Sequence, residues 1–228
     1  MTEYPHIATE RFDSAKIWIK YVINIVKPYI GKNVLEVGAG CGSFTCSYID
    51  FIKKLTLTET DNKNINNLRI IFFNKKNTKI IKADNIKKIN GRFDTIIYFN
   101  VLEHIKNDDN EINNSMKKLK KGGHLIILVP AHQKLYTEFD KTVGHYRRYS
   151  MNFFQKKFKN SIVEKLIFLD FFGYFLYFFN NLFLKKEVYP SKLKIFIWDK
   201  IFVPITVITD FIISYKFGKN ILCIYKKI

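Results

Sequence analysis

Cysteine is scarce in this sequence, with three among 228 residues. Cys41, Cys46 and Cys223 form no CxxC pair, which excludes a disulfide-stapled scaffold and predicts a reducing, cytoplasmic environment. The five histidines are scattered without the spacing of metal ligands, so we expect no metal site.

The chain also lacks a long apolar segment. Its longest strongly apolar uncharged run, from Phe171 to Leu184, has 14 residues, whereas about 20 are needed to cross a bilayer. The first 14 residues include several charged side chains and no apolar stretch, so no secretory signal peptide is predicted. We expect a cytoplasmic protein, either soluble or in peripheral contact with the inner face of the membrane.

Acidic residues are few as well: 20 Asp and Glu stand against 38 Lys and Arg, for a net charge of +18. Such an excess suggests an anionic partner such as nucleic acid, a membrane surface or a phosphorylated substrate. The alternative is codon bias, because 33 of the basic residues are Lys and the chain also has 20 Asn. Residues 1–150 hold 25 basic and 15 acidic residues and 151–228 hold 13 and 5, so no basic arm is predicted.

What the sequence does contain is an alternation of short apolar segments and helical patterns. Strands are predicted at residues 33–38, 55–59, 78–82, 93–99 and 124–129. Helices are predicted at residues 11–26, from 43, from 61 or 62, and up to 121, the last ended by Gly122 and Gly123. This order implies an α/β fold with a parallel sheet and helices on both faces. Ligands of such sheets bind beyond the carboxyl ends of the strands.

Aromatic residues gather in the last third of the chain, with 20 of the 37 in residues 151–228. A predicted strand at 162–169 leads into an aromatic insertion, about 171–218, and a final strand follows at 221–225. Three interpretations of the insertion stay open: core or subunit interface, a lid over a substrate site, or an interfacial segment on an anionic membrane.

A glycine-rich loop follows the first predicted strand, in the order Glu36-Val-Gly38-Ala39-Gly40-Cys-Gly42. Glycines let the backbone turn sharply and approach a ligand closely, and the start of a helix adds oriented N–H groups. The pattern is G-x-G-x-G, whereas a dinucleotide site has G-x-G-x-x-G, with Ser43 here in the last position. Because Glu36 would repel a pyrophosphate, the loop favours a ligand with an amino group or positive charge over a nicotinamide dinucleotide.

Two further acids end the next predicted strands. Glu59 lies 21 residues after Gly38, where doubly wound folds place the carboxylate that binds a ribose diol. Asp84 ends the third predicted strand, at a height suited to an adenine amino group. Asp61 and Asp84 could instead cap helices. Acids at successive strand ends beside one glycine loop favour a nucleoside-containing ligand.

These motifs resemble those of class I S-adenosylmethionine-dependent methyltransferases. The resemblance runs through VLEVGAGCG, Glu59, Ala83-Asp84, FDTIIYFNVLEHI and LKKGGHLIILVP. The segment VPAHQKLYTEFDKTVGHYRRYS is similar to a bacterial subgroup associated with glycosyltransferases and envelope polysaccharide genes. The family implies a Rossmann-like, doubly wound, mostly parallel sheet of seven strands in the order 3-2-1-4-5-7-6, with the last strand antiparallel and the insertion helical.

The resemblance implies a single methyltransferase domain over residues 1–228. Residues 1–30 would hold the N-terminal helix, 31–130 the cofactor-binding core, and 131–228 the acceptor-side loop, the insertion and the last strand. The implied cofactor is S-adenosylmethionine. Its binding residues, carried over by resemblance, are Glu36, Gly38, Ala39, Gly40, Gly42, Glu59, Asp84, Asn85, Asn100 and Val101.

Each part of the cofactor has an implied partner. Glu36 would meet its amino group and Glu59 its ribose. Asp84 and Asn85 would meet the adenine, and the pair after the fourth strand, Asn100 and Val101, would border the methionine and the sulfonium.

The acceptor side is predicted in the loop at 131–149, because an ordered loop this long is usually functional. Arg147 and Arg148 are two of only five arginines. Because the other 33 basic residues are Lys, these two positions are expected to need a planar guanidinium. It would bind a carboxylate or phosphate of the substrate, or else a structural partner within the fold. Tyr146 and Tyr149 are predicted to wall the acceptor pocket.

His145 is the candidate general base for a hydroxyl acceptor, because an imidazole with a pKa of about 6.5 suits that work. His104, soon after the fourth predicted strand, is the rival. A structural role for each histidine also stays open. The strand is followed by Asn100-Val-Leu-Glu103-His104 and not by the Asn-Pro-Pro-aromatic run typical of enzymes that methylate adenine amino groups.

The sequence therefore predicts a methyltransferase for a small-molecule, sugar or lipid-linked acceptor, with O-methylation favoured and nucleic acid disfavoured. One alternative is an RNA methyltransferase, which the charge suggests. Another is a non-catalytic scaffold that keeps the cofactor fold within a glycosyltransferase assembly.

Overall fold

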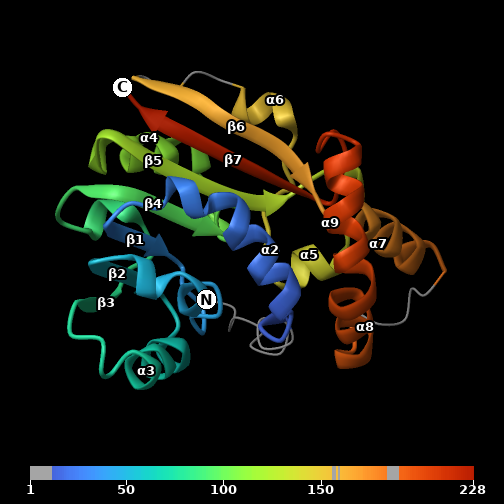
Figure 1. Ribbon diagram of the computed structural model, residues 1–228, viewed down its shortest axis with the longest axis horizontal. Helices are drawn as coiled ribbons and strands as arrows, with labels where there is room; N and C mark the ends of the chain where they lie inside the picture. Colours follow the sequence, from blue (N-terminus) through green and yellow to red (C-terminus); the bar gives the residue numbers. More distant parts are fainter. Residues whose placement is uncertain (1–11, 156–157, 159, 184–189) are drawn as a thin grey trace.

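The computed structural model centres on a seven-stranded sheet with the order β3-β2-β1-β4-β5-β7-β6 (Figure 1). It describes residues 12–155, 158, 160–183 and 190–228, with side chains described for all of these but 181–183. The strands are β1 (Asn33–Val37), β2 (Lys54–Glu59), β3 (Thr78–Lys82), β4 (Phe93–Phe99), β5 (Leu119–Pro130), β6 (Ser161–Leu169) and β7 (Asn220–Lys227). Strands β1 to β5 are parallel, and β7 is antiparallel to both of its neighbours. The expected fold class and strand order are confirmed.

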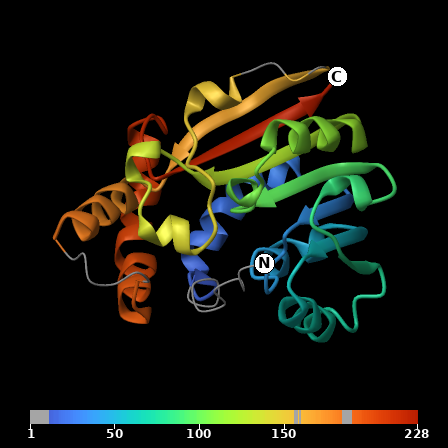
Figure 2. The same ribbon diagram turned by 180° about the vertical axis from the view of Figure 1, so that it is seen from behind.

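Helices cover both faces of this sheet, as the two opposite views show (Figure 1 and Figure 2). They are α2 (Lys16–Val26), α3 (Asn62–Ile71), α4 (Asp108–Lys118), α5 (Glu138–Thr142), α6 (Met151–Phe154), α7 (Phe171–Phe183), α8 (Lys192–Ile197) and α9 (Val203–Ile212). A π-helical turn, Trp198–Phe202, joins α8 to α9. Helices α2, α3 and α9 contribute to the core on one face, and α4 and α6 to the core on the other.

The strand sequences produce these two buried layers by simple alternation. Val34, Ile97 and Ile126 belong to the layer under α2, whereas Leu35 and Ile96 belong to the layer under α4. Successive side chains of a strand point to opposite faces, so a strand covered on both sides reads as a continuous apolar run. This is why the strand segments were recognisable in the sequence.

The chain after the glycine loop differs from the prediction. The sequence predicts a helix from Ser43, whereas the structure has two 3₁₀ turns, Thr45–Ser47 and Ile49–Phe51. The hydroxyl groups of Thr45 and Tyr48 both donate hydrogen bonds to the buried carboxylate of Glu36. Because two polar side chains turn inward to one carboxylate, this segment forms tight turns and not a regular helix.

The end of α4 also differs from the prediction. The expected helix runs to Lys121, but α4 ends at Lys118, and Gly122 and Gly123 lie within β5. A Cβ atom at Gly123 would lie 2.8 Å from the carbonyl oxygen of Asp94 on β4. Glycine is needed there because two strands approach closely where their register shifts, and not because a helix ends.

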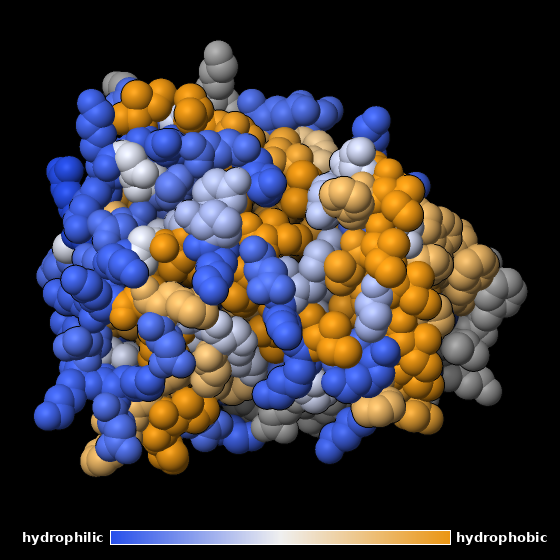
Figure 3. Space-filling view, viewed as in Figure 1, coloured by the Kyte–Doolittle hydropathy of each residue, from blue (hydrophilic) through white to orange (hydrophobic). Residues whose placement is uncertain are grey.

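The described part of the aromatic insertion is helical, as predicted, and two of its acidic side chains, Asp199 and Asp210, point inward. Asp199 accepts hydrogen bonds from the backbone N–H groups of Ile17 and Trp18 in α2, both at 3.0 Å. Asp210 accepts one from the Tyr21 hydroxyl at 2.9 Å. These bonds hold the insertion against α2, and its outer surface forms the orange band over α8 and α9 in Figure 3. Among the described residues, no helix is both long and apolar enough to cross a membrane.

Candidate active site

The glycine-rich loop after β1 lies at the carboxyl edge of the sheet, where the sequence predicts the cofactor. Gly38, Gly40 and Gly42 have positive φ angles of 67°, 56° and 84°, which residues with a Cβ atom rarely adopt. A Cβ atom at Gly38 would lie 2.7 Å from Cγ2 of Val101, in the turn after β4. The loop and this turn are therefore in close contact.

Glu59 closes the loop from the neighbouring strand. Its carboxylate accepts hydrogen bonds from the backbone N–H groups of Gly40 at 2.8 Å, Thr60 at 2.6 Å and Asp61 at 3.0 Å. The Thr60 hydroxyl also donates to Oε1 at 3.3 Å, whereas among the described residues Oε2 accepts only the Gly40 N–H, so Oε2 keeps an acceptor position for a ribose hydroxyl. Asp61 caps α3 by accepting from the N–H of Asn64 at 2.9 Å, which was its alternative role.

Glu36 is a buried acid of β1, two residues before Gly38. Its side chain is 2% exposed, and burial raises its pKa to about 7, although the hydrogen bonds from Thr45 and Tyr48 act in the opposite direction. A positive group beside such a carboxyl favours its charged form. The residue therefore fits a ligand with an ammonium group.

Asp84 and Asn85 follow β3 along the same edge. The N–H of Ala83 donates to the carbonyl oxygen of Glu59 at 3.1 Å, which joins the ends of β3 and β2. Asp84 is exposed, and its ion pair with Lys88 at 2.9 Å is the main cause that lowers its pKa. Asn85 lines a hollow of about 240 Å³ together with side chains of α4. Both residues can be reached by a ligand that extends past Glu59.

Asn100 and Val101 directly follow β4, the next strand of the sheet. Asn100 has a φ of 54°, and its N–H donates to the carbonyl oxygen of Leu128 at 2.8 Å. On the loop side, the N–H of Ala39 donates to the carbonyl oxygen of Thr58 at 2.9 Å. The ten residues predicted to hold the cofactor thus lie on or directly after four adjacent strands, β3, β2, β1 and β4. The buried carboxyl group of Glu36 and the glycine loop fit a ligand that joins a nucleoside to an amino acid.

Soon after Val101 in the chain comes His104, which the fold brings together with His145, 41 residues later in the sequence. The rings of His104 and His145 meet edge to face, with centroids 4.6 Å apart. Nε2 of His145 lies 3.9 Å from Oε1 of the buried Glu103. One ligand atom from each of the three residues lies within 4.8 Å of the others, and we call them the Glu103–His104–His145 cluster. The scattering of histidines in the sequence therefore does not exclude a metal site.

Asp140 orients His145 within this cluster. Its buried carboxylate lies 2.8 Å from Nδ1 of His145 and forms a two-point pair with Arg148 at 2.9 and 3.0 Å. The hydroxyl group of Tyr177, from α7, donates to it at 3.0 Å. Burial alone would raise the pKa of Asp140, but the hydrogen bond of His145 and the charge of Arg148 hold it well below its usual range. A fixed anion therefore holds Nδ1, so that Nε2 is directed toward Glu103.

Burial changes the acid–base properties of the other two members. It raises the pKa of Glu103 to about 7, an effect that the charge of His145 partly offsets. It also lowers the pKa of His104 to about 3, so this imidazole is neutral at ordinary pH. A neutral imidazole carries a nitrogen lone pair that can accept a proton or a metal ion.

The arginine pair is bound within the fold. The guanidinium of Arg147 donates to Asp108 at 2.8 Å and to the carbonyl oxygen of Lys106 at 2.9 Å. That of Arg148 is buried against Asp140, with its centre 4.5 Å from the ring centroid of Tyr177. These contacts favour the structural alternative for both residues, and their binding of an acceptor stays a prediction.

The two tyrosines of this loop have different environments. Tyr149 is 2% exposed, and its hydroxyl group donates toward the carbonyl oxygen of Leu102 at 3.0 Å and toward Asp108 at 2.9 Å. Tyr146 is 54% exposed, and its N–H donates to the carbonyl oxygen of Glu103 at 2.8 Å. Tyr146 can therefore face an acceptor, whereas Tyr149 packs beneath the loop and anchors it.

Glu103, Asp140 and Tyr177 belong to this site but are absent from the predicted set. Glu103 directly precedes His104, and Asp140 lies five residues before His145, so both carried a local signal. Tyr177 carried none, because its contact with Asp140 spans 37 residues and depends on how α7 packs.

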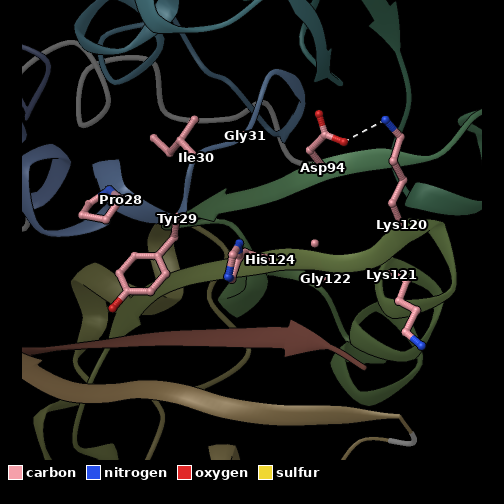
Figure 4. A pocket seen from close by; sticks show the side chains of 10 residues that line it. Pro28, Tyr29, Ile30, Gly31, Asp94, Lys120, Lys121, Gly122 and His124 are labelled. Atoms are coloured by element: carbon pink, nitrogen blue, oxygen red, sulfur yellow. Dashed lines mark ion pairs between the residues drawn. The ribbon is translucent and has the colours of Figure 1, made fainter.

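A second hollow of about 240 Å³ lies at the opposite edge of the sheet, where β4 and β5 begin (Figure 4). Asp94 and Lys120 line it and pair with each other at 2.7 Å. Because it lies away from the carboxyl edge of the strands, this hollow is not part of the candidate site.

Solved methyltransferase structures share this fold. An S-adenosylmethionine-dependent methyltransferase from Clostridium acetobutylicum ATCC 824 superposes with a TM-score of 0.59 at 13% identity, covering 94% of this chain and 92% of that chain. Coclaurine N-methyltransferase, bound to N-methylheliamine and SAH, gives 0.62 at 15% identity, covering 92% and 72%. The N-methyltransferase NodS from Bradyrhizobium japonicum WM9, in complex with S-adenosyl-L-homocysteine, gives 0.58 at 14% identity, covering 99% and 89%.

Sequence comparison identifies the family. No curated protein sequence matches the chain. A model of the methyltransferase domain matches residues 17–164, which run from α2 into β6 and include the glycine loop and both histidines of the cluster. Because this match spans well over half of the chain and agrees with the fold, the chain belongs to the methyltransferase domain family, which confirms the class of enzyme expected from its motifs.

Proposed function

We propose that this methyltransferase transfers the methyl group of S-adenosylmethionine to an oxygen atom of a small-molecule, sugar or lipid-linked acceptor. The observation that carries the proposal is the position of Val101. Its side chain contacts Gly38 of the glycine loop, and two residues later the chain enters the Glu103–His104–His145 cluster. A methyl donor at the loop and an acceptor at the cluster would meet across this turn.

The chain's own contribution on the cofactor side is binding and orientation. When bound, S-adenosylmethionine supplies an electrophilic methyl group on a sulfonium. Glu36 would balance the ammonium charge, and Glu59 would accept hydrogen bonds from the ribose. Asp84 and Asn85 would border the adenine. Methyl transfer is an in-line displacement, so holding donor and acceptor in line supplies most of the rate enhancement.

The acceptor side favours oxygen over nitrogen. An alcohol must lose its proton as it attacks the methyl group, whereas a neutral amine can attack with its lone pair directly. A buried carboxylate and two imidazoles are suited to accept the proton that a hydroxyl group loses as its oxygen atom attacks. The N-methyltransferases among the structural neighbours share only the fold at 14–15% identity, so they do not decide the acceptor atom.

The outer surface of the insertion supports a lipid-linked acceptor. Among the described residues, its exposed apolar side chains, which we call the apolar face, are Phe175, Phe178, Phe179, Leu193, Phe196, Ile197, Ile201, Ile205, Ile208, Phe211 and Ile212. From Leu193 onward they recur every three or four residues, so they form one continuous stripe of a helical segment. Figure 3 shows this stripe as an orange band over α8 and α9.

The charges of this region favour an anionic membrane as the surface that the apolar face contacts. Asp199 and Asp210 are 1% and 0% exposed, whereas Lys192 and Lys216 are exposed. Lysines beside an apolar stripe are typical of helices that lie on anionic headgroups. A second copy of a chain with a net charge of +18 would bring like charges together. The hydroxyl of Tyr177 links α7 to Asp140, so the apolar face adjoins the acceptor side.

Transfer of labelled methyl from S-adenosylmethionine into the lipid, glycan and RNA fractions of a cell extract tests this function. We expect label in the lipid or glycan fraction, stable to mild alkali as a methyl ether is, and none with Glu59→Ala. Label in RNA would contradict the proposal and support the RNA alternative. S-adenosylhomocysteine binding without transfer into any fraction would support a non-catalytic scaffold.

A further inference from the structure

The carboxylate of Glu103 is unusual in its surroundings. Its side chain is 1% exposed, yet neither of its oxygen atoms has a hydrogen-bond partner among the described residues. Buried carboxylates are normally paired or hydrogen-bonded, because removing a charge from water is unfavourable. Both oxygen atoms of Glu103 therefore have acceptor positions that the described residues leave unfilled.

Two imidazoles stand next to this carboxylate. The ligand atoms of Glu103, His104 and His145 all lie within 4.8 Å of one another, and the pair Glu103 Oε1 and His145 Nε2 is 3.9 Å apart. Atoms that bind one metal ion at about 2.1 Å lie roughly 3 to 4 Å from each other. Small side-chain rotations would close the three atoms around an ion.

The neighbours of both histidines resemble the supports of metal ligands. Nδ1 of His145 is held by Asp140, whose carboxylate is fixed by Arg148. His104 has a backbone hydrogen bond with Gly144. Metal-binding histidines usually donate their second N–H to a carboxylate or a backbone carbonyl, which fixes the ring and the tautomer. The cluster thus has its ligand atoms and their supports in place.

We propose that Glu103, His104 and His145 form a binding site for a divalent transition-metal ion. Two imidazole nitrogens and one carboxylate favour Zn²⁺, Mn²⁺ or Co²⁺ over Mg²⁺ or Ca²⁺, which prefer oxygen ligands. Three protein ligands also leave positions open for another molecule, as in catalytic metal sites.

The open position gives the ion a role that deepens the proposed function and rests on it. An acceptor hydroxyl bound to the ion would release its proton to solvent more readily. Its oxygen would then form the new O–C bond as the S–C bond of the cofactor breaks, giving a methyl ether and S-adenosylhomocysteine. Binding of the ion itself does not depend on this role.

Metal titration of the tag-free full chain tests the site. We expect native mass spectrometry to show one Zn²⁺ per chain, and Co²⁺ to give a visible absorption spectrum at the same stoichiometry. Glu103→Gln and His145→Gln should abolish both signals. Asp140→Asn, which removes a support, should weaken binding by about 10- to 100-fold. His124→Gln is the matched control, because His124 pairs with Glu164 at 2.9 Å and belongs to no cluster of three metal-ligating side chains in the described part of the chain.

Folding is checked in the same samples. Glu103→Gln replaces a buried carboxylate that has no hydrogen bond from the described residues, so it should fold without metal and melt at least as high as the wild-type chain. Zn²⁺ should raise the melting temperature of the wild-type chain and of His124→Gln only. Absence of a stoichiometric ion in folded wild-type chain, or equal affinity in Glu103→Gln, would overturn the site.

S-adenosylhomocysteine binding separates this proposal from the proposed function. If the cofactor product binds and no ion does, the metal site is wrong and the methyltransferase assignment stands. If an ion binds and no methyl transfer to any fraction follows, the site stands and the proposed function fails.

Discussion

Gly38→Ala should disturb the junction between the donor and acceptor sides, because Gly38 both adopts a positive φ of 67° and faces Val101. The added Cβ atom would lie 2.7 Å and 2.9 Å from the two methyl groups of Val101. Gly122→Ala is a matched control, because Gly122 has a φ of 75° and no atom within 4 Å of such a Cβ. The two variants share the backbone strain and differ in the contact.

The expected losses of stability follow from the backbone strain and from the contact with Val101. Left-handed backbone at a residue with a Cβ atom costs about 1 kcal/mol in both variants. Overpacking adds about 1 to 3 kcal/mol for Gly38→Ala alone. If that strain is relieved by displacing the loop, S-adenosylhomocysteine affinity should fall by about 10- to 100-fold, since 1.4 kcal/mol corresponds to a factor of ten.

Denaturant unfolding and calorimetric titration with S-adenosylhomocysteine measure the two quantities. Gly122→Ala should lose about 1 kcal/mol of stability and bind the ligand as the wild-type chain does. The double variant Gly38→Ala with Val101→Ala should recover part of the loss, because it removes both methyl groups. Equal stability and equal affinity for the two single variants would refute the contact between the glycine loop and the turn after β4.

Three other perturbations test separate parts of the structure. Without cofactor, burial raises the pKa of Glu36 from 4.5 to about 7, so its stabilising contribution is complete below pH 4.5 and is lost as the pH rises through 7. Relative to Glu36→Gln, the wild-type chain should lose roughly 3 kcal/mol over that window, and a constant difference in melts from pH 4 to 8 would contradict the burial of this acid. His145→Gln should lower kcat by about 100-fold and leave S-adenosylhomocysteine affinity within about twofold, and an unchanged kcat would remove His145 from the acceptor side. Phe211→Asp, at a residue of the apolar face that is 72% exposed, should reduce co-sedimentation with anionic vesicles by about tenfold, whereas Ile70→Asp on α3, 74% exposed, should not. Equal losses of co-sedimentation in the two variants would contradict the membrane contact. So would a wild-type dimer that Phe211→Asp dissociates, because the apolar face would then be a subunit interface.

Much of the cofactor edge could be predicted because its signals are local. Strands buried on both faces read as apolar runs, and loops that need positive φ angles read as glycine. Glu59 and Asp84 were predicted to lie beside the glycine loop because parallel strands place their carboxyl ends at one edge. The order of strands and the antiparallel β7 came from the resemblance, since no pattern along the chain shows which strand lies beside which.

Other parts of the site depend on contacts that only the folded chain shows. The segment after the glycine loop was predicted as helix because the bonds from Thr45 and Tyr48 to Glu36 are tertiary. The same limit applies to the Glu103–His104–His145 cluster. His104 follows β4 and His145 follows α5, so their 4.6 Å approach has no counterpart in sequence spacing.

The central claim is that the glycine-loop edge binds S-adenosylmethionine. Calorimetric titration of the folded full chain with S-adenosylhomocysteine tests it most directly. We predict one site per chain with micromolar affinity, lost in Gly40→Val and strongly weakened in Glu59→Ala. A folded chain that gives no binding, or binding that both variants retain, would contradict the account.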